Sequence, residues 1–273
     1  MRDLIYQQSV ERSIIKNYRG PLYSKFLEAI DTYQLIQEGD RIAVALSGGK
    51  DSLLMAKLFQ EYQRHGQVHF DLVFITMDPG FHEEDINRHK NLCESLGIDL
   101  KIDHSHIFSI TDSIAKESPC YLCARMRRGF LYKTAQNYGC NKLALGHHFD
   151  DVIETTLINM FYTGTFKTML PKAKSENYEG LELIRPMYFI KEKDIERFRK
   201  YNHIEAMSCG CRVAKRELDS KRKEMKDLIQ TLRKQYKNID INIFRSAENV
   251  NLKSILGYYD DDHRYSFLDD YTK

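Results

Sequence analysis

Hydrophobic positions along the chain repeat with the period of a helix in some segments and form short apolar runs in others. Leu22, Phe26, Ile30 and Tyr33 recur at helical spacing. Further along, short β-rich runs alternate with amphipathic segments that end near glycines and polar residues. The pattern predicts helices over 21–36, 52–64, 83–96 and 122–138, and strands over 41–46, 70–77, 98–102 and 142–145.

The alternation of strands with helices predicts the fold class. Consecutive parallel strands need a crossover connection of about a dozen residues or more, usually a helix. The predicted helices lie between the predicted strands in this way. We therefore expect an α/β protein with a parallel sheet.

Segments outside this core differ from it in composition. The stretch 172–180 is polar and is expected to be a surface loop at a domain boundary, and 212–236 is expected to be a highly charged helix. The last sixteen residues carry five aspartates and are expected to form an acidic, mobile tail. The expected division is an N-terminal helical segment, a core domain, a C-terminal extension and the tail, over 1–38, 39–172, 173–257 and 258–273.

Composition bounds the class of protein. The chain has 273 residues, of which 42% are hydrophobic and 29% charged, so it is expected to be soluble and globular. Its longest apolar run, 72–77, is far shorter than a membrane span. The N-terminus is too charged for a secretory signal, so a cytoplasmic location is expected. A net charge of +2 neither requires nor excludes a nucleic-acid partner.

A glycine-rich loop follows the strand at 41–46. Its sequence is Ser47-Gly48-Gly49-Lys50-Asp51-Ser52. Two glycines allow a tight turn that aims backbone N–H groups at a phosphate, and the next helix adds its N-terminal dipole. Lys50 supplies a charge and Asp51 can hold Mg²⁺. The spacing is not that of the longer GxxxxGK[ST] loop, and a bare Gly-Gly could also simply join strand to helix.

A second polar segment, Gly146-His147-His148-Phe149-Asp150-Asp151, follows the strand at 142–145. Taken alone it has two interpretations. Aspartates at a helix start are favourable as caps without any catalysis. In register after the glycine loop, the same carboxylates are candidates for Mg²⁺ or base chemistry.

The cysteines fall into two kinds. Cys120 and Cys123 form a CxxC motif, and Cys209 and Cys211 form a later CxC pair. In a chain without a secretory signal such clusters indicate metal or catalytic ligands before disulfides. Zinc, a redox dithiol and an iron–sulfur cluster all remain open on spacing alone. Isolated Cys93 and Cys140 are expected to be buried packing residues.

Basic residues cluster at two places. Arg125, Arg127 and Arg128 follow the CxxC motif, and 212–226 is rich in lysine and arginine but interleaved with carboxylates. A solvated helix with ion pairs explains much of the second cluster. Phosphate contacts of a nucleic acid would explain both.

These motifs together resemble a known family. SGGKDS after the first strand resembles the loop of the N-type ATP pyrophosphatases, and GHHFDD resembles the GHxxDD signature of the tRNA thiolases among them. With CYLCARMRRGFLYKTA and IRPMYFIKEKDIERF, the stretch 40–235 resembles the tRNA 2-thiocytidine synthetases of TtcA type. The resemblance implies a doubly wound, Rossmann-like parallel sheet of the adenine nucleotide alpha hydrolase kind, with helical extensions. It makes 39–172 a PP-loop ATP pyrophosphatase domain, and 173–257 would complete the cluster and RNA site.

The resemblance also implies roles for individual residues. Three cysteines would hold a [4Fe-4S] cluster, namely Cys120, Cys123 and Cys209. The family's second pair is normally CxxC, so the CxC of this chain leaves Cys211 as an alternative third ligand. The implied catalytic residues are Lys50, Asp51, Arg127 and Asp151. The implied ATP-binding residues are Ser47, Gly48, Gly49, Lys50, Asp51, Ser52, Met77, Gly146, His147 and Asp150.

The activity implied by the resemblance is ATP-dependent thiolation of tRNA. ATP–Mg²⁺ would adenylate the C2 oxygen of an anticodon-loop pyrimidine, most simply cytidine, and sulfur would replace it. Expected partners are tRNA and a sulfur donor, either a cysteine desulfurase or sulfide, with no membrane and with room for a homodimer. The alternatives are 2-thiouridine formation, an ammonia-using ligase, and a non-catalytic iron–sulfur module that binds RNA.

Overall fold

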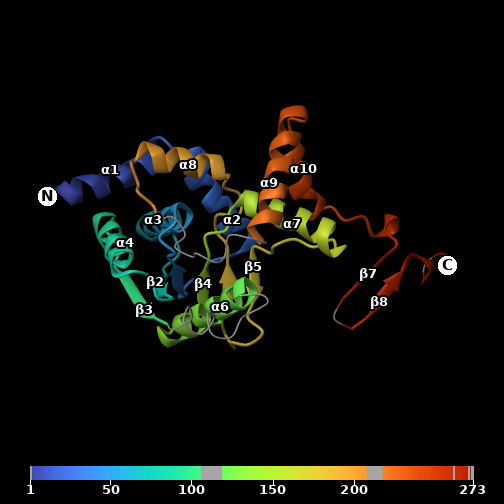
Figure 1. Ribbon diagram of the computed structural model, residues 1–273, viewed down its shortest axis with the longest axis horizontal. Helices are drawn as coiled ribbons and strands as arrows, with labels where there is room; N and C mark the ends of the chain where they lie inside the picture. The colour runs from blue at the N-terminus through green and yellow to red at the C-terminus, as the bar shows by residue number, and fades with distance from the viewer. Residues whose placement is uncertain (1, 106–118, 208–217, 261, 270, 272–273) are drawn as a thin grey trace.

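A computed structural model describes residues 2–105, 119–207, 218–260, 262–269 and 271, with the backbone alone at 2–4, 119–125 and 218–220 (Figure 1). Its centre is a six-stranded sheet in the order β3-β2-β1-β4-β6-β5. All neighbouring strands are parallel except β5, which is antiparallel to β6. The strands are β1 (Arg41–Ala45), β2 (Asp71–Asp78), β3 (Leu100–His104), β4 (Lys142–Ala144), β5 (Lys172–Lys174) and β6 (Glu182–Ile184).

Helices connect and cover these strands. They are α1 (Arg2–Lys16), α2 (Lys25–Tyr33), α3 (Lys50–His65), α4 (Glu83–Ser95), α6 (Pro119–Asn137), α7 (Phe149–Thr163), α8 (Glu192–Tyr201), α9 (Leu218–Gln235) and α10 (Ile239–Ser246). Across the described residues, no helix combines the length and apolar character that a membrane span requires.

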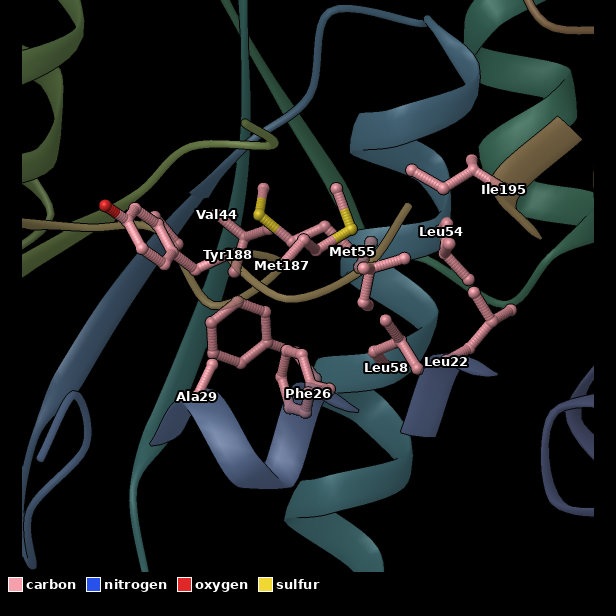
Figure 2. Close-up of a cluster of buried hydrophobic side chains, with 14 of the residues drawn as sticks. Leu22, Phe26, Ala29, Val44, Leu54, Met55, Leu58, Met187, Tyr188 and Ile195 are labelled. Carbon is pink, nitrogen blue, oxygen red and sulfur yellow. The ribbon is translucent and has the colours of Figure 1, made fainter. Parts of the chain in front are cut away.

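The two faces of the sheet have separate cores, as the alternation of side chains along β1 shows. Val44 belongs to the larger core with α2, α3 and α7, whereas Ala43 belongs to a smaller core with Ala135 of α6. Figure 2 shows the larger core, where Phe26 of α2 packs beside Leu58 of α3. From β1 the chain adds β2 and β3 on one side of the sheet, and it then returns to add β4 on the other side of β1. The sheet is therefore doubly wound, as expected.

The predicted strands and helices of the core are confirmed within a few residues. The helix expected over 21–36 is a difference, because its first part is the π-helix η1 (Arg19–Ser24) and α2 begins at Lys25. Pro21 lies inside η1 and has no N–H to donate to a regular α-helix. Gln34 ends α2 in the left-handed conformation, at φ 49°.

Two expectations about the C-terminal half were wrong in part. The polar stretch 172–180 begins with β5, and β6 follows it, so the sheet extends past residue 172. The expected acidic tail contains an antiparallel hairpin of β7 (Gly257–Tyr259) and β8 (Arg264–Ser266). Backbone pairing and stacked Tyr258 and Tyr265 rings, 4.5 Å apart, organise it despite its aspartates. The division of the chain into domains stays a prediction.

The N-terminal helix α1 is tied to α3 by an ion-pair cluster. Glu11 of α1 accepts hydrogen bonds from Lys57 Nζ at 2.7 Å and from Arg64 Nη1 at 2.8 Å. Lys57 is fully buried, so loss of Glu11 would leave a buried ammonium without its carboxylate. Burial alone would raise the pKa of Glu11, but hydrogen bonds from Arg64, Lys57 and Gln7 lower this pKa to about 2.

This cluster gives a pH-dependent prediction. Because the pKa of Glu11 is lower in the folded chain, its contribution to stability is complete above the unfolded pKa of about 4.5 and is lost as pH falls towards 2. We expect Glu11→Gln to lower the free energy of unfolding by about 3 kcal/mol at pH 7. Denaturant titrations should show the two proteins converging as pH falls from about 5 to about 2. A difference that stays constant over this range would contradict the account.

Candidate active site

A cavity of 420 Å³ opens at the carboxyl ends of β1, β2 and β4. It lies at the point where the strand order reverses, which is the usual ligand site of a doubly wound sheet. Segments far apart in the sequence line it. These include Ser47, Asp51, Ser52, Thr76, Met77, Phe81, His89, Arg127, Gly146, His147, Asp151 and Met207.

The glycine loop forms one wall and has the geometry expected for a phosphate cradle. Gly48 has φ +79°, a conformation that favours glycine. Ser52 Oγ accepts a hydrogen bond from Ser47 N at 3.2 Å and donates one to Gly49 O at 2.9 Å, which closes the turn. The N-cap residue of α3 is Gly49, which has no side chain to cap the helix, so the first amides of α3 are suited to an anion.

Two other segments approach this loop closely. A Cβ on Gly146 would lie 3.3 Å from the backbone nitrogen of Ser52, so glycine allows the turn after β4 to touch the start of α3. From the C-terminal half, Met207 N donates to Gly48 O at 2.9 Å. A Cβ on Gly48 would lie only 2.6 Å from Met207 Sδ, so the loop is covered by this segment.

Lys50 and Asp51 carry the charge of the loop. Lys50 Nζ lies 3.1 Å from the Asp51 carboxylate and 3.4 Å from Glu192 Oε1. Burial would lower the pKa of Lys50, but these two carboxylates raise it above its ordinary value. Asp51 Oδ1 is buried, and among the described residues it has the ion pair with Lys50 but accepts no well-aligned hydrogen bond, so it retains lone pairs that can ligate a cation.

The segment after β4 supplies the opposite wall. His148 caps α7: its Nδ1 accepts from Asp151 N, and Asp151 Oδ2 accepts from His148 N at 3.0 Å. Burial would raise the pKa of Asp151, but the neighbouring His148 imidazole, the backbone hydrogen bond from His148 N and the Arg222 guanidinium lower it. Asp151 is therefore both the cap and an ionised carboxylate in the cavity, so the two interpretations of this motif are compatible.

His147 faces the same cavity as a neutral group. Burial lowers the pKa of His147 to about 4. Its Nδ1 accepts a hydrogen bond from Arg185 Nε at 3.3 Å. Because arginine only donates, Nδ1 carries no proton and the remaining proton is on Nε2.

Asp150 is not brought into this cavity. Its Oδ2 accepts from Glu192 N at 2.8 Å, at the N-terminus of α8, and its Oδ1 accepts from Arg233 Nη2 at 2.8 Å. It lines a separate, charged cavity together with Glu154. The carboxylate of Asp150 thus joins α7 to α8 and α9, which does not support the expected role in ATP binding.

Sequence reasoning missed His89, which lies beside Thr76 at the end of β2. His89 is buried, and its Nε2 lies 2.9 Å from Thr76 Oγ1, which donates to Leu46 O at 2.7 Å. The single hydroxyl proton is thereby used, so His89 donates through Nε2. Burial lowers the pKa of His89. Only its position under the loop, known from the fold, could have identified it.

Of the remaining site residues that the sequence predicts, the structure describes the side chains of some and not of others. Met77 and Arg127 line the cavity as expected. Cys120 and Cys123 lie in the first turn of α6, but their side chains, with Cys209 and Cys211, lie outside the described residues. Cys93 is buried on α4, and burial raises its pKa to about 12, so its expected packing role is confirmed. Cys140 is buried in the same way.

Comparisons with known proteins agree with this geometry. The PP-loop domain family matches residues 22–208. A tRNA-cytidine(32) 2-sulfurtransferase of Geotalea uraniireducens is 39% identical over 232 residues, which are 84% of this chain and 90% of that protein. Its namesake from Geobacter metallireducens is 37% identical over 233 residues, with 84% and 89% covered.

A solved structure is similar over much of its length. The U34-tRNA thiolase NcsA from Methanococcus maripaludis, determined with its [4Fe-4S] cluster, superposes with a TM-score of 0.68 at 25% sequence identity. The match covers 86% of this chain and 80% of that chain.

The loop geometry predicts the effect of adding one methyl group. We expect Gly48→Ala to weaken ATP binding by about tenfold or more, because alanine is strained at positive φ and meets Met207. Gly139→Ala is the matched control, since Gly139 also has positive φ but open space around it. Calorimetric titration should show unchanged ATP affinity for that control. Adding Met207→Ala to Gly48→Ala should restore the ATP affinity only in part, because the strain at positive φ would remain. Full ATP affinity in Gly48→Ala would disprove the role of the loop.

Proposed function

The chain belongs to the PP-loop family and, within it, to the tRNA-cytidine(32) 2-sulfurtransferases, and we propose that it thiolates tRNA at the cytidine of position 32. One observation carries this proposal. The glycine loop and Asp151 line the same cavity as Arg127 and Met207, which are close in sequence to the two cysteine motifs. Cytidine is favoured over uridine because the cytidine-specific relatives are 37–39% identical, whereas the U34 thiolase is 25% identical.

The cavity fits ATP by its position and by its lining. The loop amides and Lys50 would hold the phosphates at the N-terminus of α3. Met77 and the neighbouring apolar side chain of Phe81 offer a surface for adenine at the end of β2. The Lys50 ammonium is paired with the carboxylates of Asp51 and Glu192 in this structure. When ATP binds, Lys50 would exchange these carboxylate oxygens for phosphate oxygens.

Two carboxylates fit a divalent cation. Asp51 offers a buried carboxylate oxygen that lies 3.1 Å from Lys50 Nζ, and the lowered pKa of Asp151 keeps that second carboxylate ionised at neutral pH. Hard oxygen ligands of this kind are those that Mg²⁺ prefers. When bound, Mg²⁺ would neutralise charge on the phosphates.

The reaction that this site supports has two steps. The C2 oxygen of the cytidine attacks the α-phosphorus of ATP, and pyrophosphate leaves. A sulfide sulfur then attacks C2, the C2–O bond breaks, and AMP leaves with that oxygen. Lys50, the loop amides and Arg127 would stabilise the charge on the phosphate in both steps.

Chain connectivity supports a cluster beside this cavity. Arg127 lines the cavity one helical turn after Cys123, and Met207 touches the loop two residues before Cys209. Three cysteines, Cys120, Cys123 and Cys209, would hold a [4Fe-4S] cluster, with Cys211 as the alternative third ligand. A cluster with three thiolates would supply an iron that can take up sulfide.

The proposed setting follows from the reaction. The sulfur would come from a cysteine desulfurase or from free sulfide, and tRNA is a cytoplasmic substrate. A homodimer stays a proposal that solution measurements must test.

Loss of charge in the loop should abolish modification without unfolding the protein. We expect Lys50→Ala and Asp51→Ala each to lower ATP-dependent AMP release and thiolation by about 100-fold or more. Lys90→Ala, which removes an exposed lysine of α4, is the control and should behave as wild type. Unchanged AMP release in either loop variant would refute the assignment.

The two cysteines of the CxC pair should differ in their effect on the cluster. We expect anaerobically purified protein to be brown, Cys209→Ala to lose iron and acid-labile sulfide, and Cys211→Ala to retain them. Metal analysis of each variant tests this directly. Complete loss of iron in both variants would disprove the three-cysteine assignment. Retention of iron in Cys209→Ala with loss in Cys211→Ala would make Cys211 the third ligand. A colourless protein that holds zinc would indicate a structural Cys₄ zinc site instead of a cluster.

A further inference from the structure

Helix α7 leads from the active-site cavity to an exposed end. Asp151, in its first turn, lines the cavity. Tyr162, in its last turn, lies eleven residues further along, which returns to the same face of a helix after about 16 Å. In Figure 1 this end of α7 extends away from the sheet, and α9 packs against the helix.

The exposed end of α7 carries aromatic rings. Phe161 is 57% exposed, Tyr162 39% and Phe166 44%. The segment after the helix folds back on it, because Thr165 N donates to Asn159 O and Asn159 Nδ2 donates to Lys167 O. Phe166 is thereby held beside the last turn of α7. We call Phe161, Tyr162 and Phe166 the aromatic strip.

Basic side chains connect the aromatic strip with the cavity. Lys221 Nζ of α9 lies 4.8 Å from the centre of the Tyr162 ring. The next residue, Arg222, reaches towards the cavity, with Nη1 3.9 Å from Asp151 Oδ1 and Nε 3.4 Å from Glu154 Oε2. Lys167 and Lys223 are also exposed. Arg222 is paired with these carboxylates, and Glu224 of α9 accepts a hydrogen bond from the Tyr162 hydroxyl. The positive charge beside the strip therefore comes from Lys221, Lys223 and Lys167.

Exposed rings beside lysines match the chemistry of unpaired RNA. Single-stranded bases stack on aromatic side chains, and basic side chains contact the phosphates between them. Lysines are depleted from the cores of protein–protein interfaces, whereas they are the side chains that contact phosphates, so their presence around the rings favours RNA. The distance along α7 is also compatible with a loop that has one base in the cavity and its neighbours outside.

We propose that the aromatic strip binds unpaired bases of the tRNA loop whose cytidine enters the cavity. This inference rests on the proposed function and adds to it the surface that positions the substrate. The strip acts on tRNA binding alone, because none of its residues lines the ATP cavity. Lys221 and Lys167 contact the phosphates of the same nucleotides.

The decisive comparison uses two substitutions of one ring in the full-length protein. Phe161→Leu keeps an apolar side chain but removes the stacking surface, and Phe161→Trp keeps that surface. We expect Phe161→Leu to weaken binding of unmodified tRNA by about fivefold or more and to raise KM for tRNA equally. Phe161→Trp should stay within about twofold of wild type, and neither should change KM for ATP.

Controls separate stacking from other effects. Tyr236→Leu removes an exposed ring at the far end of α9 and should leave tRNA affinity unchanged. A duplex RNA with the same stem but no unpaired loop should bind wild type and Phe161→Leu equally. Lys221→Gln should reduce the slope of log affinity against log salt by about 0.7–1.

Each outcome decides between the proposals. If wild type thiolates tRNA but Phe161→Leu binds tRNA normally, the strip is not an RNA surface and the proposed function stands. If Phe161→Leu converts a dimer to a monomer in sedimentation while tRNA affinity is retained, the strip is an interface between two copies. If wild type neither binds nor thiolates tRNA, the proposed function itself fails.

Discussion

The close approach of Gly146 to the N-terminus of α3 is the contact on which the active site depends. β1 and β4 are neighbours at the point where strand order reverses, so the turns that follow them meet at one edge of the sheet. Glycine at 146 lets these turns come within van der Waals contact. The loop that is suited to phosphate and the carboxylate of Asp151 are therefore walls of one cavity, although about a hundred residues separate them.

The C-terminal half completes the site through ionic contacts. Glu192 bridges Lys50 of the loop and Lys226 of α9, at 3.4 Å and 2.6 Å. Asp150 holds the N-terminus of α8 and also pairs with Arg233 of α9. The position of Lys50 is thus coupled to α9, one of the helices that carry the proposed tRNA surface. This coupling explains why a PP-loop domain of this kind would need residues beyond its sheet.

The core of the fold and the centre of the site could be predicted from the sequence because local patterns encode them. The apolar run before SGGKDS makes a buried strand, and the loop must then lie at its carboxyl end. His89, Met207 and Glu192 could not be found in this way, since each reaches the site through tertiary contacts. Asp150 was predicted for the site but does not reach it. It is next to Asp151 in the sequence, yet on the helix its side chain points in another direction, towards α8 and Arg233.

The central claim is that the cavity activates the C2 oxygen of a tRNA cytidine as an AMP ester. It can be tested with a tRNA transcript whose cytidines carry ¹⁸O at C2, incubated anaerobically with the protein, ATP–Mg²⁺ and sulfide. Mass spectrometry of the nucleotide product should show one ¹⁸O in AMP for each sulfur atom gained by the tRNA. Thiolated tRNA accompanied by unlabelled AMP, or by ADP, would contradict the account.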